Sequence, residues 1–175
     1  MYNIKAIPTI YNGVQYRSRL EAKWAIFFDL LNWKYSYEPD DLHKWSPDFK
    51  LVTSAGTKFL VEIKPTVLTD RKLRLKLGEA TNFSSNILIL GEFPFQADFN
   101  NFIGISSIQG KTKNHLNELD FEFCSSVIMN LYDQGNDIFN LCIENQEVMG
   151  NFDLAEDFTS SLWKEATNKV QFLKP

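Results

Sequence analysis

Cysteine is scarce in this chain of 175 residues, which contains only Cys124 and Cys142. The two stand far apart and lack the spacing of a metal site. Isolated cysteines of this kind are expected to lie reduced in a core rather than to form a disulfide. The expected compartment is therefore the cytosol.

Long hydrophobic runs are absent as well. No apolar stretch reaches the roughly 18 residues of a transmembrane helix, so no membrane partner is expected. The segment from Met1 to Lys5 lacks the apolar region of a signal peptide. Hydrophobic residues make up 44% of the chain and aromatic residues 14%, which suffices for the core of one domain with a modest extension.

Positive charge is in deficit over the whole chain, and the formal net charge of −4 argues against a general nucleic-acid binder. The two halves differ sharply, however. Residues 1–78 hold 13 Lys and Arg against 8 Asp and Glu, whereas residues 79–175 hold 5 against 14. Such an asymmetry is informative, because the first half has the positive charge that a phosphate-binding surface needs.

Two runs of strand composition, residues 46–52 and 58–64, flank a short Ser/Ala/Gly loop and predict a β-hairpin. If the hairpin turns at the middle of that loop, Asp48 faces Glu62, and opposed Cβ atoms lie about 4.5–5.5 Å apart. Two carboxylates so placed repel each other unless a cation lies between them. A hard divalent cation such as Mg²⁺ takes oxygen ligands from one or two carboxylates. Lys64 points to the same face, so the hairpin places two acids and one base together.

A helix is predicted from Ser18 to about residue 31 or 32, because Ser18-x-x-Glu21 is a capping-box pattern. The segment is apolar most of the way round, which is typical of a buried helix. Glu21 has two interpretations: it caps the helix, or it adds a third carboxylate to the pair in the hairpin. It shares its face with Trp24 and Phe28 and so points toward packed structure, which favours the site. The two roles can alternate.

Pro47-Asp48, followed by Glu62-Ile63-Lys64, resembles the PD-(D/E)xK signature of the restriction-endonuclease-like nuclease superfamily. The upstream segment 16–25 resembles the helix that supplies a further acidic residue in many phage and transposon members. The resemblance covers about residues 11–95. It implies an α/β fold with a restriction-endonuclease-like mixed central sheet flanked by helices.

The resemblance also implies an activity, the metal-dependent hydrolysis of phosphodiester bonds. DNA is the expected substrate, and a phage or mobile element is the expected setting, hence the cytoplasm of a bacterial host. The catalytic residues would be Glu21, Asp48, Glu62 and Lys64. Asp48, Glu62 and the Ile63 carbonyl would hold Mg²⁺ or Mn²⁺, and Glu21 would bind this ion directly, through water, or hold a second one. Lys64 would orient or help deprotonate the attacking water and offset charge in the transition state.

Basic side chains around these motifs are candidates for contacts with a nucleic-acid backbone. A helix predicted from Thr69-Asp70 to about Asn82 has a basic face and directly follows the Glu-x-Lys strand. Residues 86–91 form a continuous apolar run, typical of a buried central strand, and a helix between two strands implies a parallel crossover. The predicted nucleic-acid-binding residues are Arg17, Arg19, Lys50, Arg71, Lys72 and Lys76.

The other segments carry no motif. Residues 33–39 predict a strand. Glu38, Asp40 and Asp41 are expected to be solvated loop acids rather than ligands. In the second half, strands or a buried helix are predicted at 104–108 and 121–131. A strand at 138–143 and a helix at 154–170 complete the prediction.

Two parts of the chain are therefore expected. Residues 1–95 would form the nuclease core, and residues 96–175 would form an acidic α+β C-terminal extension. This extension would complete the domain or offer a surface to a protein partner or to a second copy in a homodimer. An alternative function stays open: a nuclease-like fold acting as a non-catalytic DNA- or protein-binding module, or as a subunit of a larger nuclease or transposase complex.

Overall fold

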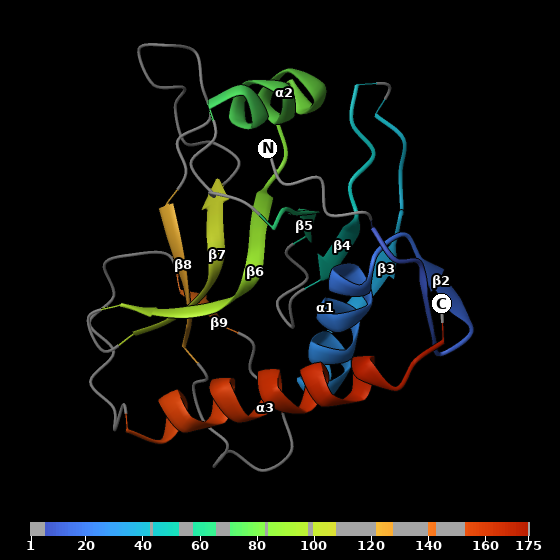
Figure 1. Cartoon of the computed structure of the whole chain (residues 1–175). Coiled ribbons are helices and arrows are strands. Elements are labelled where there is room, and N and C mark those ends of the chain that lie inside the picture. The colour runs from blue at the N-terminus through green and yellow to red at the C-terminus, as the bar shows by residue number, and fades with distance from the viewer. Residues whose placement is uncertain are drawn as a thin grey trace.

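The computed structural model describes residues 6–42, 44–52, 58–65, 71–82, 84–97, 100–107, 122–127, 140–142 and 153–174 (Figure 1). The fold is mixed α/β, as the sequence predicts. Its elements, in chain order, are β1 (Thr9–Tyr11), β2 (Val14–Tyr16), α1 (Arg19–Leu30), β3 (Lys34–Tyr37), β4 (Phe49–Val52), β5 (Lys58–Ile63), α2 (Arg71–Thr81), β6 (Ile87–Ala97), β7 (Asn100–Ser107), β8 (Glu122–Val127), β9 (Asn140–Cys142) and α3 (Asp153–Gln171).

The strands from β3 to β9 form one mixed sheet of seven strands, with neighbours in the same order as in the chain. β5 and β6 run parallel, and every other neighbouring pair in this sheet is antiparallel. α2 lies between the two parallel strands in the chain and so forms the predicted crossover. The β4-β5 hairpin has the predicted register, in which Lys50 pairs with Leu60 and Val52 with Lys58.

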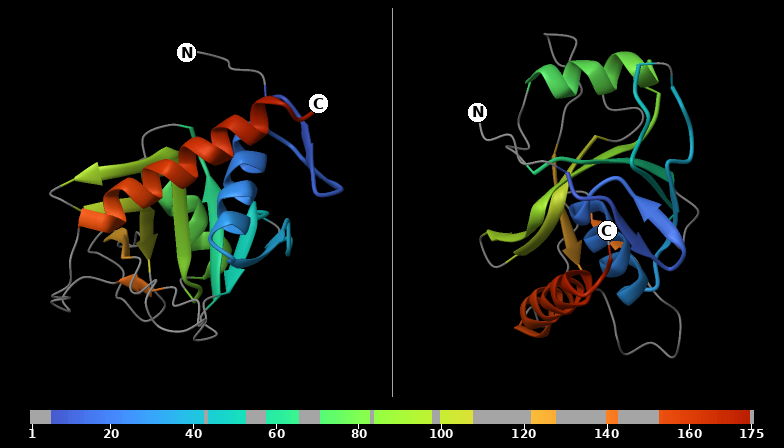
Figure 2. Two further views of the ribbon diagram at one scale, coloured as in Figure 1. Left: turned by 90° about the horizontal axis from the view of Figure 1, so that it is seen from below. Right: turned by 45° about the vertical axis from the view of Figure 1, so that its right-hand side comes forward.

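Two hydrophobic cores lie on opposite faces of this sheet. α1 and α3 cover one face and α2 covers the other (Figure 2). Because strand side chains alternate between faces, β6 contributes Leu88 and Leu90 to the first core and Ile87 and Ile89 to the second. A strand that is apolar on both faces is a buried central strand, which is the role predicted for this segment.

Residues with positive φ end two helices and close the N-terminal turn. Asn32 (φ 54°) follows α1 and Asn82 (φ 47°) ends α2, both in the left-handed conformation that terminates many helices. β1 and β2 form a separate two-stranded sheet joined by Asn12 and Gly13, whose positive φ angles suit a type I′ turn. An Asn-Gly pair is typical of such a turn, whereas no pattern in the sequence predicts β1 before it.

β7 approaches β6 closely at Gly104. A Cβ atom at this position would lie 2.1 Å from the carbonyl oxygen of Ile89, a distance that no side chain tolerates. Gly104 pairs with Leu90 on one side and with Cys124 of β8 on the other. The glycine therefore lets the strands of the second half join the central strand.

The described part of residues 96–175 belongs to the same sheet and the same core. β6 continues to Ala97, past the expected boundary at residue 95, and β7 to β9 extend the sheet beyond it. α3 buries Leu162, Ala166 and Val170 in the core beneath α1. The segments at 104–107 and 122–127 are strands rather than a buried helix, which decides between the two predicted alternatives for these residues. None of the described helices has the length and apolar composition that crossing a membrane requires.

Candidate active site

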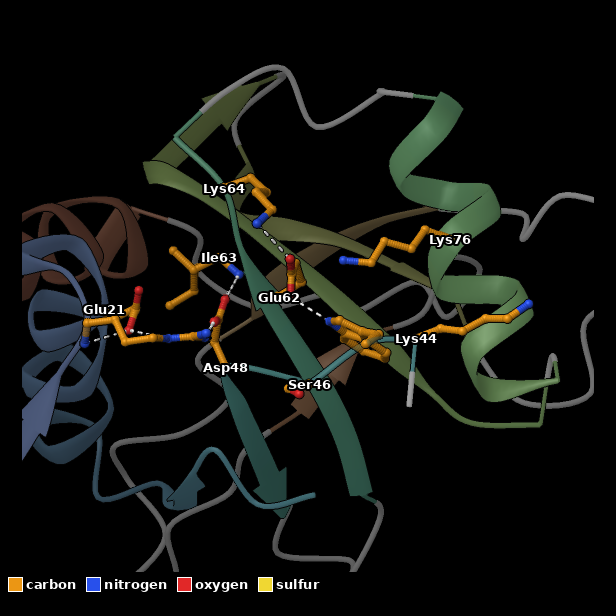
Figure 3. A pocket seen from close by; sticks show the side chains of 10 residues that line it. Glu21, Lys44, Ser46, Asp48, Glu62, Ile63, Lys64 and Lys76 are labelled. Carbon is orange, nitrogen blue, oxygen red and sulfur yellow. Dashed lines mark hydrogen bonds and ion pairs between the residues drawn. The ribbon is translucent and has the colours of Figure 1, made fainter. Parts of the chain in front are cut away.

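Asp48 and Glu62 come from neighbouring strands at one end of the β4-β5 hairpin (Figure 3). Phe49 pairs with Val61, and the same register carries Asp48, one residue before β4, opposite Glu62. The Asp48 N–H donates to the Val61 carbonyl over 2.9 Å, which continues the pairing beyond the end of β4. Asp48 is 5% exposed and Glu62 3%. Two buried carboxylates thus face each other where the sequence predicts them.

Asp48 has a donor on each oxygen. Its Oδ2 accepts the Ile63 N–H over 2.7 Å, and its Oδ1 lies 2.5 Å from Nη2 of Arg17. Burial nevertheless raises the pKa of Asp48 to about 7, with further increases from the charges of Glu62 and Glu21. The Ile63 N–H and the Arg17 charge lower this pKa but do not offset the rise. Burial and the neighbouring acids therefore make the charged form of Asp48 costly in spite of its two donors.

Glu62 is held by two side chains from different places in the chain. Lys64 Nζ lies 2.7 Å from its Oε1, which is the same-face contact that the sequence predicts. The indole Nε1–H of Trp45 donates to Oε2 over 2.6 Å. Trp45 is buried with Leu77 and Ile87 in the core beneath α2, so its orientation is fixed by packing. Sequence reasoning missed Trp45, although a buried tryptophan usually needs a partner for its N–H.

Glu21 makes the contacts of a capping residue. Its backbone N–H donates to Ser18 Oγ over 3.1 Å, and the Ser18 hydroxyl donates to Glu21 Oε1 over 2.8 Å. Its Oε2 accepts the Tyr37 hydroxyl over 2.6 Å and the Arg17 N–H over 3.1 Å. These bonds match the capping interpretation. Glu21 still interacts electrostatically with the hairpin, because its charge contributes to the raised pKa of Asp48.

Arg17, predicted to contact nucleic acid, pairs with acids of its own chain. Its Nε lies 2.8 Å from Glu38 Oε1 and 3.9 Å from Glu21 Oε2, in addition to the contact of Nη2 with Asp48. Glu38 follows β3 with a φ of 43°, and its N–H donates to the Asp48 carbonyl over 2.9 Å. Expected only as a solvated loop acid, Glu38 therefore has specific contacts that the sequence does not predict.

The other predicted basic residues are distributed unevenly. Lys76 reaches from α2 toward Glu62 (Figure 3). Lys50, on β4, is ion-paired instead, with its Nζ 3.4 Å from Oδ2 of Asp40. Arg19 lies in the first turn of α1, and its Nε is buried without a hydrogen-bond partner. Lys72 is exposed on α2, and the side chain of Arg71 lies outside the described residues. Lys44, which was not predicted, borders the site and pairs with Glu79.

Asp48 and Glu62 line one pocket of about 400 Å³. Polar and charged side chains from three layers of the fold meet there: the start of α1, the hairpin, and α2. The lining residues are Arg17, Glu21, Lys44, Trp45, Ser46, Asp48, Glu62, Ile63, Lys64 and Lys76.

The donor set fits a hard divalent cation only in a limited form. Among the residues that the structure describes, no three His, Cys, Asp or Glu side chains group closely enough to hold a metal ion. Mg²⁺ needs no more than one or two carboxylates, because it keeps several waters and binds substrate phosphates as well. Asp48 and Glu62, opposed on neighbouring strands at the pocket, would provide these carboxylates, with the adjacent Ile63 carbonyl as a further oxygen. Glu21 would reach it through water while its capping bonds persist.

Comparison of the chain with known proteins gave no further assignment: no family model, no curated protein and no solved structure matches it.

Proposed function

We propose that this chain is a Mg²⁺- or Mn²⁺-dependent nuclease that hydrolyses phosphodiester bonds in DNA. The observation that carries the proposal is the pair of buried, opposed carboxylates, Asp48 and Glu62, beside Lys64 in a polar pocket. A buried acid pair of this kind is costly to a fold, which is why it points to a ligand rather than to stability.

The order of elements supports the same proposal. A helix with an acidic residue in its first turn, a Pro-Asp strand and a Glu-x-Lys strand follow one another in the chain. The two strands belong to a mixed sheet, and helices cover both faces of this sheet. This is the arrangement expected of a restriction-endonuclease-like nuclease of the phage or mobile-element type.

The protein's own groups have separable tasks in this reaction. Asp48, Glu62 and the Ile63 carbonyl would hold the ion, which when bound polarises the scissile phosphate and acidifies a water. Lys64, in contact with Glu62, would orient that water and offset the negative charge that develops on the phosphate. Lys44 and Lys76 border the pocket on the side of α2 and would hold the neighbouring phosphates.

A cleavage assay tests the proposal. The purified chain would be incubated with supercoiled plasmid, linear duplex, single strand and a four-way junction, in Mg²⁺, Mn²⁺ or EDTA. We expect metal-dependent cutting that falls at least about a hundredfold in Asp48→Asn, Glu62→Gln and Lys64→Ala. Glu165→Gln, which removes a surface charge on α3, serves as the matched control. Cutting that persists in Asp48→Asn or Glu62→Gln would refute the assignment.

One observation favours a second candidate, a nuclease-like module that binds DNA or protein without cutting it. The capping bonds of Glu21 and the ion pair of Arg17 with Asp48 leave these groups satisfied by the protein alone. A folded chain that neither binds metal in calorimetry nor cuts any substrate would favour this candidate. Metal binding without cutting would point instead to a missing subunit of a larger complex.

A further inference from the structure

Arg17 contacts three acids at the mouth of the pocket. Nη2 lies against Asp48, while Nε lies 2.8 Å from Glu38 and 3.9 Å from Glu21. A side chain that binds phosphate would be expected to leave its guanidinium open to the ligand. The guanidinium of Arg17 instead pairs with Asp48, one of the carboxylates proposed to hold the metal.

The contact with Asp48 joins an accessible group to a buried one. The side chain of Arg17 is 54% exposed, whereas that of Asp48 is 8% exposed. Packing therefore fixes the carboxylate but not the guanidinium. Since Ile63 N–H occupies Oδ2, Arg17 stands at Oδ1, the other oxygen of Asp48. A divalent cation at this oxygen would repel the guanidinium, because like charges at contact distance interact strongly in a partly buried site.

From these contacts we propose that Arg17 is a built-in counter-ion which a divalent cation displaces from Asp48, and whose freed guanidinium then binds a phosphate of the substrate. The inference rests on the proposed function and deepens it. It assigns Arg17 two successive partners, the carboxylate before metal binding and the phosphate after it. A planar guanidinium suits both, because carboxylate and phosphate accept the same forked donor.

The backbone around Arg17 allows such an exchange. The Arg17 N–H donates to Tyr37 Oη over 2.9 Å and to Glu21 Oε2 over 3.1 Å, so the main chain is held when the side chain turns. Glu38, whose side chain is 43% exposed, pairs with Nε of Arg17 and would keep the guanidinium beside the pocket after it leaves Asp48. The movement therefore needs a change of side-chain rotamer and no unfolding of α1.

The test measures metal affinity directly. Mn²⁺ alone would be titrated into the full chain, into Arg17→Gln and into Lys169→Ala by calorimetry, at one slightly alkaline pH for all three proteins. Lys169, ion-paired with Glu165 on α3, is the control for loss of one paired cation. We expect Arg17→Gln to bind Mn²⁺ at least about tenfold more tightly than the unchanged chain, and Lys169→Ala to bind it equally. DNA cleavage should nevertheless be slower in Arg17→Gln.

Equal or weaker Mn²⁺ binding by a folded Arg17→Gln protein would overturn this inference while leaving the nuclease proposal intact. Failure of every protein to bind Mn²⁺ would overturn both. A second measurement needs no variant: the Nε–H resonance of Arg17 in the unchanged chain should shift when Mg²⁺ is added. A resonance that stays in place at saturating Mg²⁺ would also overturn the inference.

Discussion

At Asp48, burial and repulsion raise the pKa, whereas a hydrogen bond and an ion pair lower it. Two donors, the Ile63 N–H and Arg17, favour its charged form, yet its pKa is raised to about 7. Burial is the largest cause and the charge of Glu62 the next. Near neutral pH, a proton and a metal ion therefore compete for the same carboxylate.

This competition predicts a pH dependence of metal binding. Because the pKa of Asp48 is about 7, the metal must displace a proton below that pH and none well above it. We expect metal affinity to fall about tenfold per pH unit below 7 and to level off above it. Calorimetry in two buffers of different ionisation enthalpy should detect about one released proton at acidic pH. Constant affinity with no proton release would contradict the assignment of Asp48 as a ligand.

Trp45 gives a second prediction at this scale. Trp45→Phe keeps most of the buried ring but removes the N–H that Glu62 accepts. Groups that orient a metal ligand typically contribute about 10–100-fold to affinity or activity. We expect a loss in this range for Mg²⁺ binding, with a thermal midpoint close to that of the unchanged chain. A large fall in the midpoint with normal Mg²⁺ affinity would show that Trp45 serves packing alone.

The sequence predicts part of the site for a physical reason. Strand alternation and a symmetric turn place Asp48, Glu62 and Lys64 on one face, because both rules act over short distances in the chain. Trp45 and Arg17 follow no such rule. Their contacts depend on the path of the loops before β4 and α1, which local patterns do not determine.

At the scale of elements, α1 begins with a cap that also restrains a candidate site residue. Ser18 Oγ accepts the Glu21 N–H and donates to the Glu21 carboxylate. The two bonds form a closed pair between the N-cap and the third residue of the helix. The start of α1 is therefore stabilised by the same carboxylate that faces the pocket.

We expect Ser18→Ala to lower the free energy of unfolding by about 1 kcal/mol, because the first turn of α1 loses its N-cap acceptor. Urea denaturation measures the change. Ser46→Ala is the control, since Ser46 is exposed and its hydroxyl makes a long hydrogen bond of 3.4 Å to Asp41. Equal unfolding free energies for the two variants would mean that the cap contributes nothing to stability.

The elements themselves are largely predictable. The segments predicted as α1, α2, β6 and α3 are found within a few residues of their expected ends, except that β6 extends to Ala97. Amphipathic or continuous apolar patterns specify these elements. β1 was missed because three residues are too few to show alternation, and its pairing depends on the Asn12-Gly13 turn.

At the scale of the whole molecule, the two halves of opposite charge share one core. α3 belongs to the acidic half, yet its Ala166 is fully buried in the core that contains Trp24 and Phe28 of α1. Charge asymmetry along the chain therefore does not mark a boundary between independent folding units.

A matched pair of substitutions on α3 tests this unity. Ala166→Glu places a charge in the shared core, whereas Asn168→Glu places the same charge at an exposed position two residues away. We expect Ala166→Glu to lower the free energy of unfolding by about 3 kcal/mol or more and Asn168→Glu to change it little. The expected readout by circular dichroism is a single cooperative unfolding transition that moves to lower urea concentration in Ala166→Glu. Similar stability of the two variants would show that α3 is dispensable for the fold.

The packing of α3 against α1 affects when the pocket can form during synthesis of the chain. Among the described residues, the side chains that border the pocket have all been translated by residue 76, but the core that supports α1 lacks Val170 until the chain has been made as far as that residue. If the pocket needs this support, we expect it to form only after α3 has been made. A nascent chain carries all the chemical groups of the site without the support that holds them in place.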